Sequence, residues 1–371
     1  MSLTVISVRD IVLKSSAFAV AEKDMRITFL IGNGFDLAVG LKTSFTDFFP
    51  IYCEQESNTD IVVKFKKDIK KDIEKDSQED SGKITWADFE RKMGEHTTEY
   101  LEMDDFTSCM IDFKKSFIKH LQKEEARVNF KDESIRKDIL SKFRKSLFAI
   151  PSFFPFVLNN NLQENFFSRY PLDFTFVNFN YTTIFDKCIE FLKEDEDKRI
   201  PNQNKQPGKA SFSVKHIHGT MEEPILMGVD NVAQIKNETF SKSRIFQQTL
   251  IKPDINERLA NGYHSQISTH IEASDVIIVF GMSMGETDAS WWRKICDWLS
   301  NYHYNRRLII FAKTSQDADS KNNSEIPFRI EDSVKNRFLG HSKLSEATIE
   351  AMHKRIHVAL NKNIFDLPLA K

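Results

Sequence analysis

Four short apolar runs of this sequence each end in residues that can bind a ligand or take part in catalysis. Glycine is scarce, with 12 in 371 residues, yet several glycines gather at these ends. Glycine allows close approach to the backbone, asparagine and serine hydrogen-bond, and histidine exchanges protons near neutral pH. The residues at the ends are Gly32, Asn33, Gly34 and Asp36; then Asn180; then His218 and Gly219; then Gly281, Ser283, Gly285 and Asp288.

The first end is a Gly-x-Gly turn. Gly32 and Gly34 follow the buried-strand pattern at 27–31 and precede a predicted helix. The free N–H groups and partial positive charge of a helix N-terminus suit a pyrophosphate, and a side chain at either glycine would keep a ligand from the backbone. The same pattern is also typical of a tight strand-to-helix turn, and the third glycine of the common dinucleotide fingerprint is missing at the expected spacing.

The third end carries two histidines, His216 and His218, two positions apart on a predicted strand and therefore on one face of it. Such a pair can bind zinc or iron, but further ligands would have to come from carboxylates such as Glu222, Asp230 or Asp288. We expect no metal ion, and we interpret His218 as a catalytic base beside Gly219, which leaves room for a substrate. A purely structural histidine pair remains an alternative.

The fourth end, residues 281–285, matches the G-x-S-x-G pattern of a serine hydrolase. The pattern lies between a predicted strand and a predicted helix, as a nucleophile elbow requires. However, few strands follow it, and no predicted strand end presents a downstream acid or histidine. In the other interpretation, Ser283 lines a ribose or phosphate, and Asp288 caps the following helix.

The elements that must position these residues are strands at 27–31, 174–179, 214–218, 276–280 and 308–312. Each run is short and rich in β-branched or aromatic residues. The order of strands and helices predicts an α/β fold with a Rossmann-like, mainly parallel sheet. Ligands bind outside the carboxyl ends of the strands in such sheets, so the polar ends should share one crevice.

The rest of the chain is predicted to elaborate this domain. We expect an extension of unknown role at 1–24, the α/β domain at 25–50 and 170–371, and a large helical insertion at 51–169. An apolar stripe at helical spacing, from Phe106 to Leu121, indicates a core helix. Residues 198–209 are predicted to form a loop, and the apolar spacing between 349 and 360 predicts a closing helix.

Composition excludes several classes of protein. The net charge of −2 and the pI near 6.6 do not indicate direct nucleic-acid binding. The four cysteines are widely separated, which is typical of reduced thiols in a cytoplasmic protein. No apolar run approaches the roughly 20 residues of a transmembrane helix, so we expect no membrane association.

Several ordered blocks resemble the AbiH family of bacterial phage abortive-infection proteins. They begin with the segments 29–37 and 40–45 and extend to the segment that ends at Asp288, over most of the chain. The intervening blocks are Trp86-Ala87-Asp88-Phe89-Glu90, Asn178-Phe179-Asn180-Tyr181-Thr182 and His216-Ile217-His218-Gly219.

The AbiH family in turn is similar to the sirtuin-like group of NAD-binding domains. That resemblance implies that Gly32, Asn33 and Gly34 contact the NAD phosphates, Asn180 the nicotinamide ribose, and Gly281 and Ser283 the adenosine half, with His218 as the base. Asp36, Gly219, Gly285 and Asp288 would complete the cofactor-binding set. Two departures matter: the four-cysteine zinc module of sirtuin deacetylases is absent, and Asn33 and Asp36 replace the Ala and Ser of the sirtuin turn.

Together these expectations describe a protein that defends against phage by cleaving NAD, its substrate, at the nicotinamide–ribose bond. We expect a homo-oligomer that responds to a phage-derived trigger. A serine hydrolase using Ser283, or a non-enzymatic nucleotide sensor, remains an alternative.

Overall fold

The computed structural model describes residues 24–57, 59–79, 84–154, 171–195, 210–259, 263–301, 306–314 and 325–370. The predicted extension up to residue 23 and the predicted loop at 198–209 lie outside these ranges.

The described residues form a six-stranded sheet in the order β3-β2-β1-β4-β5-β6, with every neighbouring pair parallel. This confirms the α/β, Rossmann-like prediction. The strands are β1 (Met25–Ile31), β2 (Leu172–Asn178), β3 (Ala210–His216), β4 (Val276–Phe280), β5 (Arg307–Ala312) and β6 (Ile356–Leu360).

All five predicted strands are present, but the predicted closing helix is only half right. Helix α16 (Glu346–His353) is followed by strand β6, which pairs with β5. The apolar positions 349, 352, 356 and 360 fit a helix by spacing. The free edge of β5, together with Ile356 and Val358, favours a strand for the second half, because β-branched residues suit a strand that can pair.

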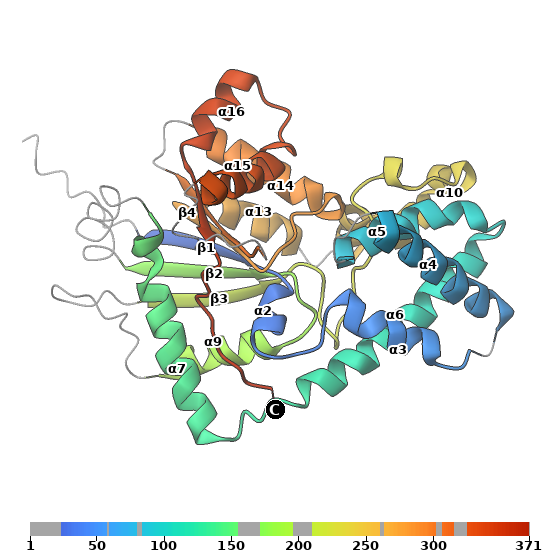
Figure 1. The fold of residues 1–371 in the computed structure, drawn as a ribbon, viewed down its shortest axis with the longest axis horizontal. Coiled ribbons are helices and arrows are strands. Elements are labelled where there is room, and N and C mark those ends of the chain that lie inside the picture. The colour runs from blue at the N-terminus through green and yellow to red at the C-terminus, as the bar shows by residue number, and fades with distance from the viewer. Residues whose placement is uncertain are drawn as a thin grey trace, which may run out of the picture.

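Helices cover both faces of the sheet (Figure 1). One face packs against α2 (Gly34–Ala38), α7 (Glu133–Phe148), α9 (Ile184–Glu194) and the C-terminal segment 361–370. The other face packs against α13 (Tyr263–Ala273), α14 (Ala289–Ser300), α15 (Glu325–Leu339) and α16. In the first layer, Phe365 of the C-terminal segment is fully buried against Phe29 of β1 and Phe35 of α2. This segment therefore holds the turn after β1 in place.

A third hydrophobic cluster defines a helical unit beside the sheet, at the right of Figure 1. The predicted stripe from Phe106 to Leu121 is buried along one of its helices. The boundary at 51–169 does not match this packing, because α7 packs on the sheet, whereas residues 225–251 join the helical unit. The unit contains α3 (Phe45–Glu54), α4 (Asp60–Glu79), α5 (Trp86–His96), α6 (Met103–Glu125), α10 (Glu238–Lys242) and α11 (Arg244–Leu250). Helix α12 (Lys252–Leu259) follows α11 directly.

Candidate functional site

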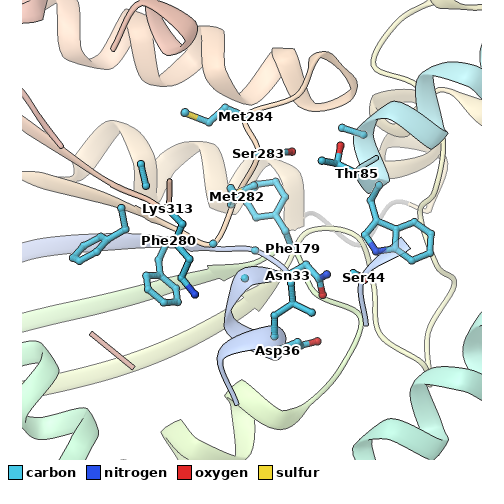
Figure 2. Close-up of a pocket in the computed structure, with 18 of the residues that line it drawn as sticks. Asn33, Asp36, Ser44, Thr85, Phe179, Phe280, Met282, Ser283, Met284 and Lys313 are labelled. Atoms are coloured by element: carbon cyan, nitrogen blue, oxygen red, sulfur yellow. The ribbon is translucent and has the colours of Figure 1, made fainter. Parts of the chain in front are cut away.

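A large cavity lies at the carboxyl ends of the central strands, between the sheet and the helical unit (Figure 2). Its volume is about 1040 Å³. It opens where the strand order reverses, between β1 and β4. Every predicted site residue except Gly219 and Gly285 lines it: Gly32, Asn33, Gly34, Asp36, Asn180, His218, Gly281, Ser283 and Asp288. The structure therefore confirms that the four strand ends share one crevice.

The glycines of the first turn are required for a reason other than the predicted one. A Cβ atom at Gly34 would lie 2.4 Å from Gly281 Cα, and one at Gly32 would lie 2.6 Å from Gly281 O. The Gly34 N–H donates to Gly281 O at 2.8 Å, so it is not free to bind an anion. The two turns pack backbone to backbone, and the predicted anion cradle at Gly32 and Gly34 is replaced by this contact.

Asn33 is also engaged within the protein. Its Nδ2 donates to Thr43 O at 3.1 Å, and its Oδ1 accepts from Thr43 Oγ1 at 2.6 Å. Because both polar atoms of the amide have partners, the side chain anchors the segment that leads into α3.

Asp36 forms a buried polar cluster under the crevice. Thr182 Oγ1 donates to its carboxylate at 2.8 Å, and Asn180 Nδ2 lies 3.3 Å away. Burial raises the pKa of Asp36 to about 7, and the Thr182 hydrogen bond only partly opposes this effect. The same Nδ2 donates to Gly32 O at 3.2 Å, whereas no described residue donates to Asn180 Oδ1. Asn180 is therefore held rigidly, with one acceptor atom left for a ligand.

His218 begins a chain of buried ionic groups that joins the sheet to the helical unit. His218 Nε2 lies 3.1 Å from Asp288 Oδ1, and Lys252 Nζ lies 2.8 Å from the same oxygen. Lys252 Nζ also lies 2.9 Å from Glu90 Oε2 on α5. Asp288 occupies the N-cap position of α14, as predicted, but its side chain makes no capping hydrogen bond to that helix. The carboxylate is used by His218 and Lys252 instead.

The charges of these buried ionic groups determine which ring nitrogen of His218 is available to a ligand. Burial alone would raise the pKa of Asp288, but the adjacent Lys252 and His218 lower it well below its usual range. For Lys252, burial favours the neutral amine, but Asp288 and Glu90 raise its pKa. Because the Asp288 carboxylate faces Nε2, an N–H on that nitrogen is directed at Asp288, and in that tautomer the Nδ1 lone pair is left as an acceptor. No described residue hydrogen-bonds Nδ1, so His218 can act as a base toward the cavity that it lines.

His216 does not join His218 in a shared site. Strand β3 ends at His216, and His216 Nε2 lies 2.9 Å from Asp186 on α9, whereas His218 pairs with Asp288. His216 Nδ1 lies 2.9 Å from Asn180 O. Burial favours the neutral ring, but these acceptors raise the pKa of His216. His216 therefore fixes the β2 end in place, and no group of three or more metal-ligating side chains occurs in the described ranges.

The turn that contains Ser283 differs from a nucleophile elbow. After β4 ends at Phe280, residues 281–288 form a loop and a short 3-10 turn before α14 begins. The positive φ angles are at Gly281 (70°) and Met284 (53°), not at the serine. No hydrogen bond joins Ser283 Oγ to a histidine in the described part of the chain. Figure 2 shows Ser283 pointing across the cavity toward Thr85.

The same turn has backbone donors that no sequence pattern indicates. The backbone N–H groups of Met282, Ser283 and Met284 make no hydrogen bond to any described residue. All three residues line the cavity, and successive free N–H groups form a typical binding site for phosphate oxygens.

Two helix N-termini of the helical unit border the cavity as well. Ser44 caps α3 and Thr85 caps α5, each in a reciprocal capping box, and both residues line the cavity. A helix N-terminus carries partial positive charge, which favours a negatively charged ligand. Both capping boxes can be recognised in the sequence, as Ser44 with Asp47 and as Thr85 with Asp88. The sequence does not indicate that the two helices begin at the same cavity.

Glu90 and Lys252 are two further site residues that were not among those predicted from the sequence. Glu90 lies four residues after Trp86, on the buried face of α5, and a carboxylate on an apolar face indicates a buried partner. Lys252 follows the apolar pair Leu250 and Ile251 and is almost fully buried. A charged residue in an apolar stretch of sequence indicates a buried ion pair, but the sequence does not identify the partner of either Glu90 or Lys252.

Comparison with known protein families matches residues 28–311 to the family described as "Bacteriophage abortive infection AbiH". The match includes most of the first five strands and all of the helical unit. No curated protein shows a significant match to the chain. Within the described ranges, no helix is both long and apolar enough to cross a bilayer.

Proposed function

The chain belongs to the AbiH family of bacteriophage abortive-infection proteins, and from that premise we propose that it acts in phage defence by cleaving NAD at the nicotinamide–ribose bond. The observation that carries the proposal is the His218–Asp288 pair beside Asn180, in a cavity at the point where the strand order reverses. A strand order of 3-2-1-4-5-6 is that of dinucleotide-binding sheets, which bind their ligand at this point.

The cavity offers a binding surface for each part of a dinucleotide. The nicotinamide ribose would lie between Asn180 and His218. The pyrophosphate would lie against the free N–H groups of residues 282–284, in the field of the α3 and α5 N-termini. The adenosine half would extend over the carboxyl ends of β4 and β5. A volume of about 1040 Å³ is ample for such a ligand.

His218 would supply general-base catalysis. The bond to nicotinamide breaks with its electron pair leaving on the cationic ring, which departs neutral, while the ribose develops positive charge. A water molecule adds at the ribose carbon and gives its proton to His218 Nδ1. Asp288, held ionised by Lys252, stabilises the resulting imidazolium through Nε2. Positioned base catalysis is worth roughly 10² to 10⁴ in rate.

Asn180 would hold the ribose. Its Nδ2 is fixed by Gly32 O and Asp36, so its Oδ1 is the atom available to accept a hydrogen bond from a ribose hydroxyl. A held sugar matters because correct positioning lowers the barrier by several kcal/mol, of the order of 7–11 in well-oriented systems.

The test is release of nicotinamide from NAD, with purified protein and in phage-infected cells. We expect His218→Ala and Asn180→Ala to abolish release, whereas His353→Ala, a half-exposed histidine on α16 outside the cavity, should leave it intact. Infected cells belong in the test because control by a phage-derived trigger is part of the proposal. An NAD hydrolase that is always active would kill its own host.

Two other outcomes would replace the proposal. Ser283→Ala should reduce activity only modestly, so complete loss together with covalent labelling by a fluorophosphonate would indicate a serine hydrolase. Binding of NAD with constant cellular NAD during an effective defence response would indicate a non-enzymatic sensor.

A further inference from the structure

One end of the cavity is lined by cationic side chains. Lys313 follows β5, Arg329 and Arg337 lie on α15, and Lys362 follows β6. Arg329 and Arg337 are eight residues apart, and the α15 residues that line the cavity share one helical face: 326, 329, 330, 333, 334 and 337. In Figure 2, Lys313 lies on the opposite side of the cavity from Ser44 and Thr85. The cationic end is therefore the one far from the helical unit.

The acidic residues that line the cavity, Asp36, Glu90 and Asp288, each have a hydrogen-bonding or ionic partner. Two of them, Glu90 on α5 and Asp288, which is joined to Glu90 through Lys252, lie at the end near the helical unit. At the other end only Arg329 has an acidic partner among the described residues, Glu325, and that pair is exposed at the surface. The cationic end thus has an excess of positive charge that is not matched within the described structure.

A dinucleotide bound as proposed would place its adenosine at this end. With the nicotinamide at His218 and the pyrophosphate at residues 282–284, the adenosine ribose would lie over β5, near Lys313 and the cavity-lining face of α15. The ribose 2′ position is where phosphorylated and unphosphorylated dinucleotides differ, and arginines near it accommodate the 2′-phosphate.

Resting on the proposed function, we propose that the preferred ligand carries a 2′-phosphate on its adenosine ribose, so that the site selects NADP-type over NAD-type dinucleotides. Lys313 and Arg337 would provide most of the selectivity, because no described carboxylate competes for them. A hydrogen bond to a charged group is worth about 1.5–3 kcal/mol, which corresponds to roughly tenfold or more in affinity for each contact.

The experiment is a fluorescence titration of the full chain with NADPH and with NADH. The reduced ligands are suitable because their dihydronicotinamide is not a cationic leaving group, so binding is measured without turnover. We expect NADPH to bind at least about tenfold more tightly than NADH at low salt. The double variant Lys313→Ala/Arg337→Ala should weaken NADPH binding to the NADH level and leave NADH binding unchanged.

Lys335→Ala is the matched control, since Lys335 is on the same helix but does not line the cavity. It should preserve the preference for NADPH. Equal affinity for the two ligands, or equal weakening of both by the double variant, would overturn the 2′-phosphate assignment and leave the proposed function standing. If neither ligand binds and NAD and NADP also fail to bind, both proposals are wrong.

Discussion

Replacing Lys252 with methionine removes the cation from the buried chain that links Glu90 to His218. The Lys252 side chain is 4% exposed and lies within 2.9 Å of Glu90 and 2.8 Å of Asp288. Methionine keeps most of the volume, so the main effect is electrostatic. Removing one partner of a buried ion pair costs about 3–5 kcal/mol, because the remaining charge is left uncompensated. Since Asp288 retains His218, we expect the lower end, about 3 kcal/mol of unfolding free energy.

The loss should depend on pH with a defined sign. In the wild-type protein the folded-state pKa of Asp288 lies below its unfolded value, so its stabilising contribution is present at neutral pH and is lost only as the pH falls through the folded pKa. In Lys252→Met the burial of Asp288 is no longer opposed by the lysine, which raises the folded-state pKa of Asp288, so stability falls as the pH rises through that value. We therefore expect the largest loss near neutral pH and a smaller loss toward about pH 5.

Urea titrations of Lys252→Met, Glu90→Gln and the double variant measure these effects. The double variant should recover part of the loss, because the Glu90 charge is removed with its partner. Lys242→Met is the matched control, since the Lys242–Glu238 pair is 76% and 89% exposed and should contribute little. A loss in Lys252→Met below about 1 kcal/mol that does not vary with pH would refute the idea of a tightly coupled, desolvated ionic chain.

Three further changes test the packing around the site. Gly34→Ala places a Cβ 2.4 Å from Gly281 Cα, so it should destabilise the protein by about 1–3 kcal/mol and weaken nucleotide binding, measured by thermal unfolding and ligand titration. Phe365→Ala empties a fully buried site and should cost about 3–5 kcal/mol in urea titrations. Asp36→Asn removes a group whose folded-state pKa is raised to about 7, so the wild-type stability falls as the pH rises from the unfolded pKa to the folded one; the variant should therefore gain stability relative to wild type between about pH 4 and 7.

Exposed positions provide the controls for these changes. Phe328→Ala alters a phenylalanine that is 65% exposed, and Asp138→Asn alters an exposed aspartate on α7. Neither should change stability by more than about 0.5 kcal/mol. The reasoning fails if Gly34→Ala is tolerated without loss, if Phe365→Ala behaves like Phe328→Ala, or if Asp36→Asn leaves the pH profile unchanged.

The sequence predicts the sheet well because its signals are local. The run that became β4 is a continuous apolar segment, and the run that became β1 is apolar except for Arg26 and Thr28, as expected for parallel strands buried on both faces. The carboxyl ends of neighbouring parallel strands lie on the same edge of the sheet. Asn180, after β2, and His218, after β3, therefore converge on one crevice, as the order of elements predicts. The error at 356–360 arose because apolar spacing fits a helix and a strand equally well when the partner strand is unknown.

The details of the site depend on contacts between distant residues, which no local pattern contains. Lys252 and Glu90 are 162 positions apart, and the second carboxylate, Asp288, is 36 positions beyond Lys252. The glycine pattern at 32 and 34 was visible, but the backbone that approaches it is the turn at Gly281. A glycine in the sequence indicates that another group packs closely against the backbone there, but it does not identify that group.

The central position of β1 has a consequence for how the protein is made. Asn180, just after β2, bonds to Gly32 over 148 positions, and Asp275, just before β4, bonds to Arg26 over 249 positions. Ribosomes add about 5–20 residues per second, so β1 emerges roughly 12–50 seconds before its β4 edge can be paired. Contacts this far apart in sequence also form slowly. During that interval an apolar strand with open edges is exposed to aggregation, and we expect newly synthesised chains to need chaperones.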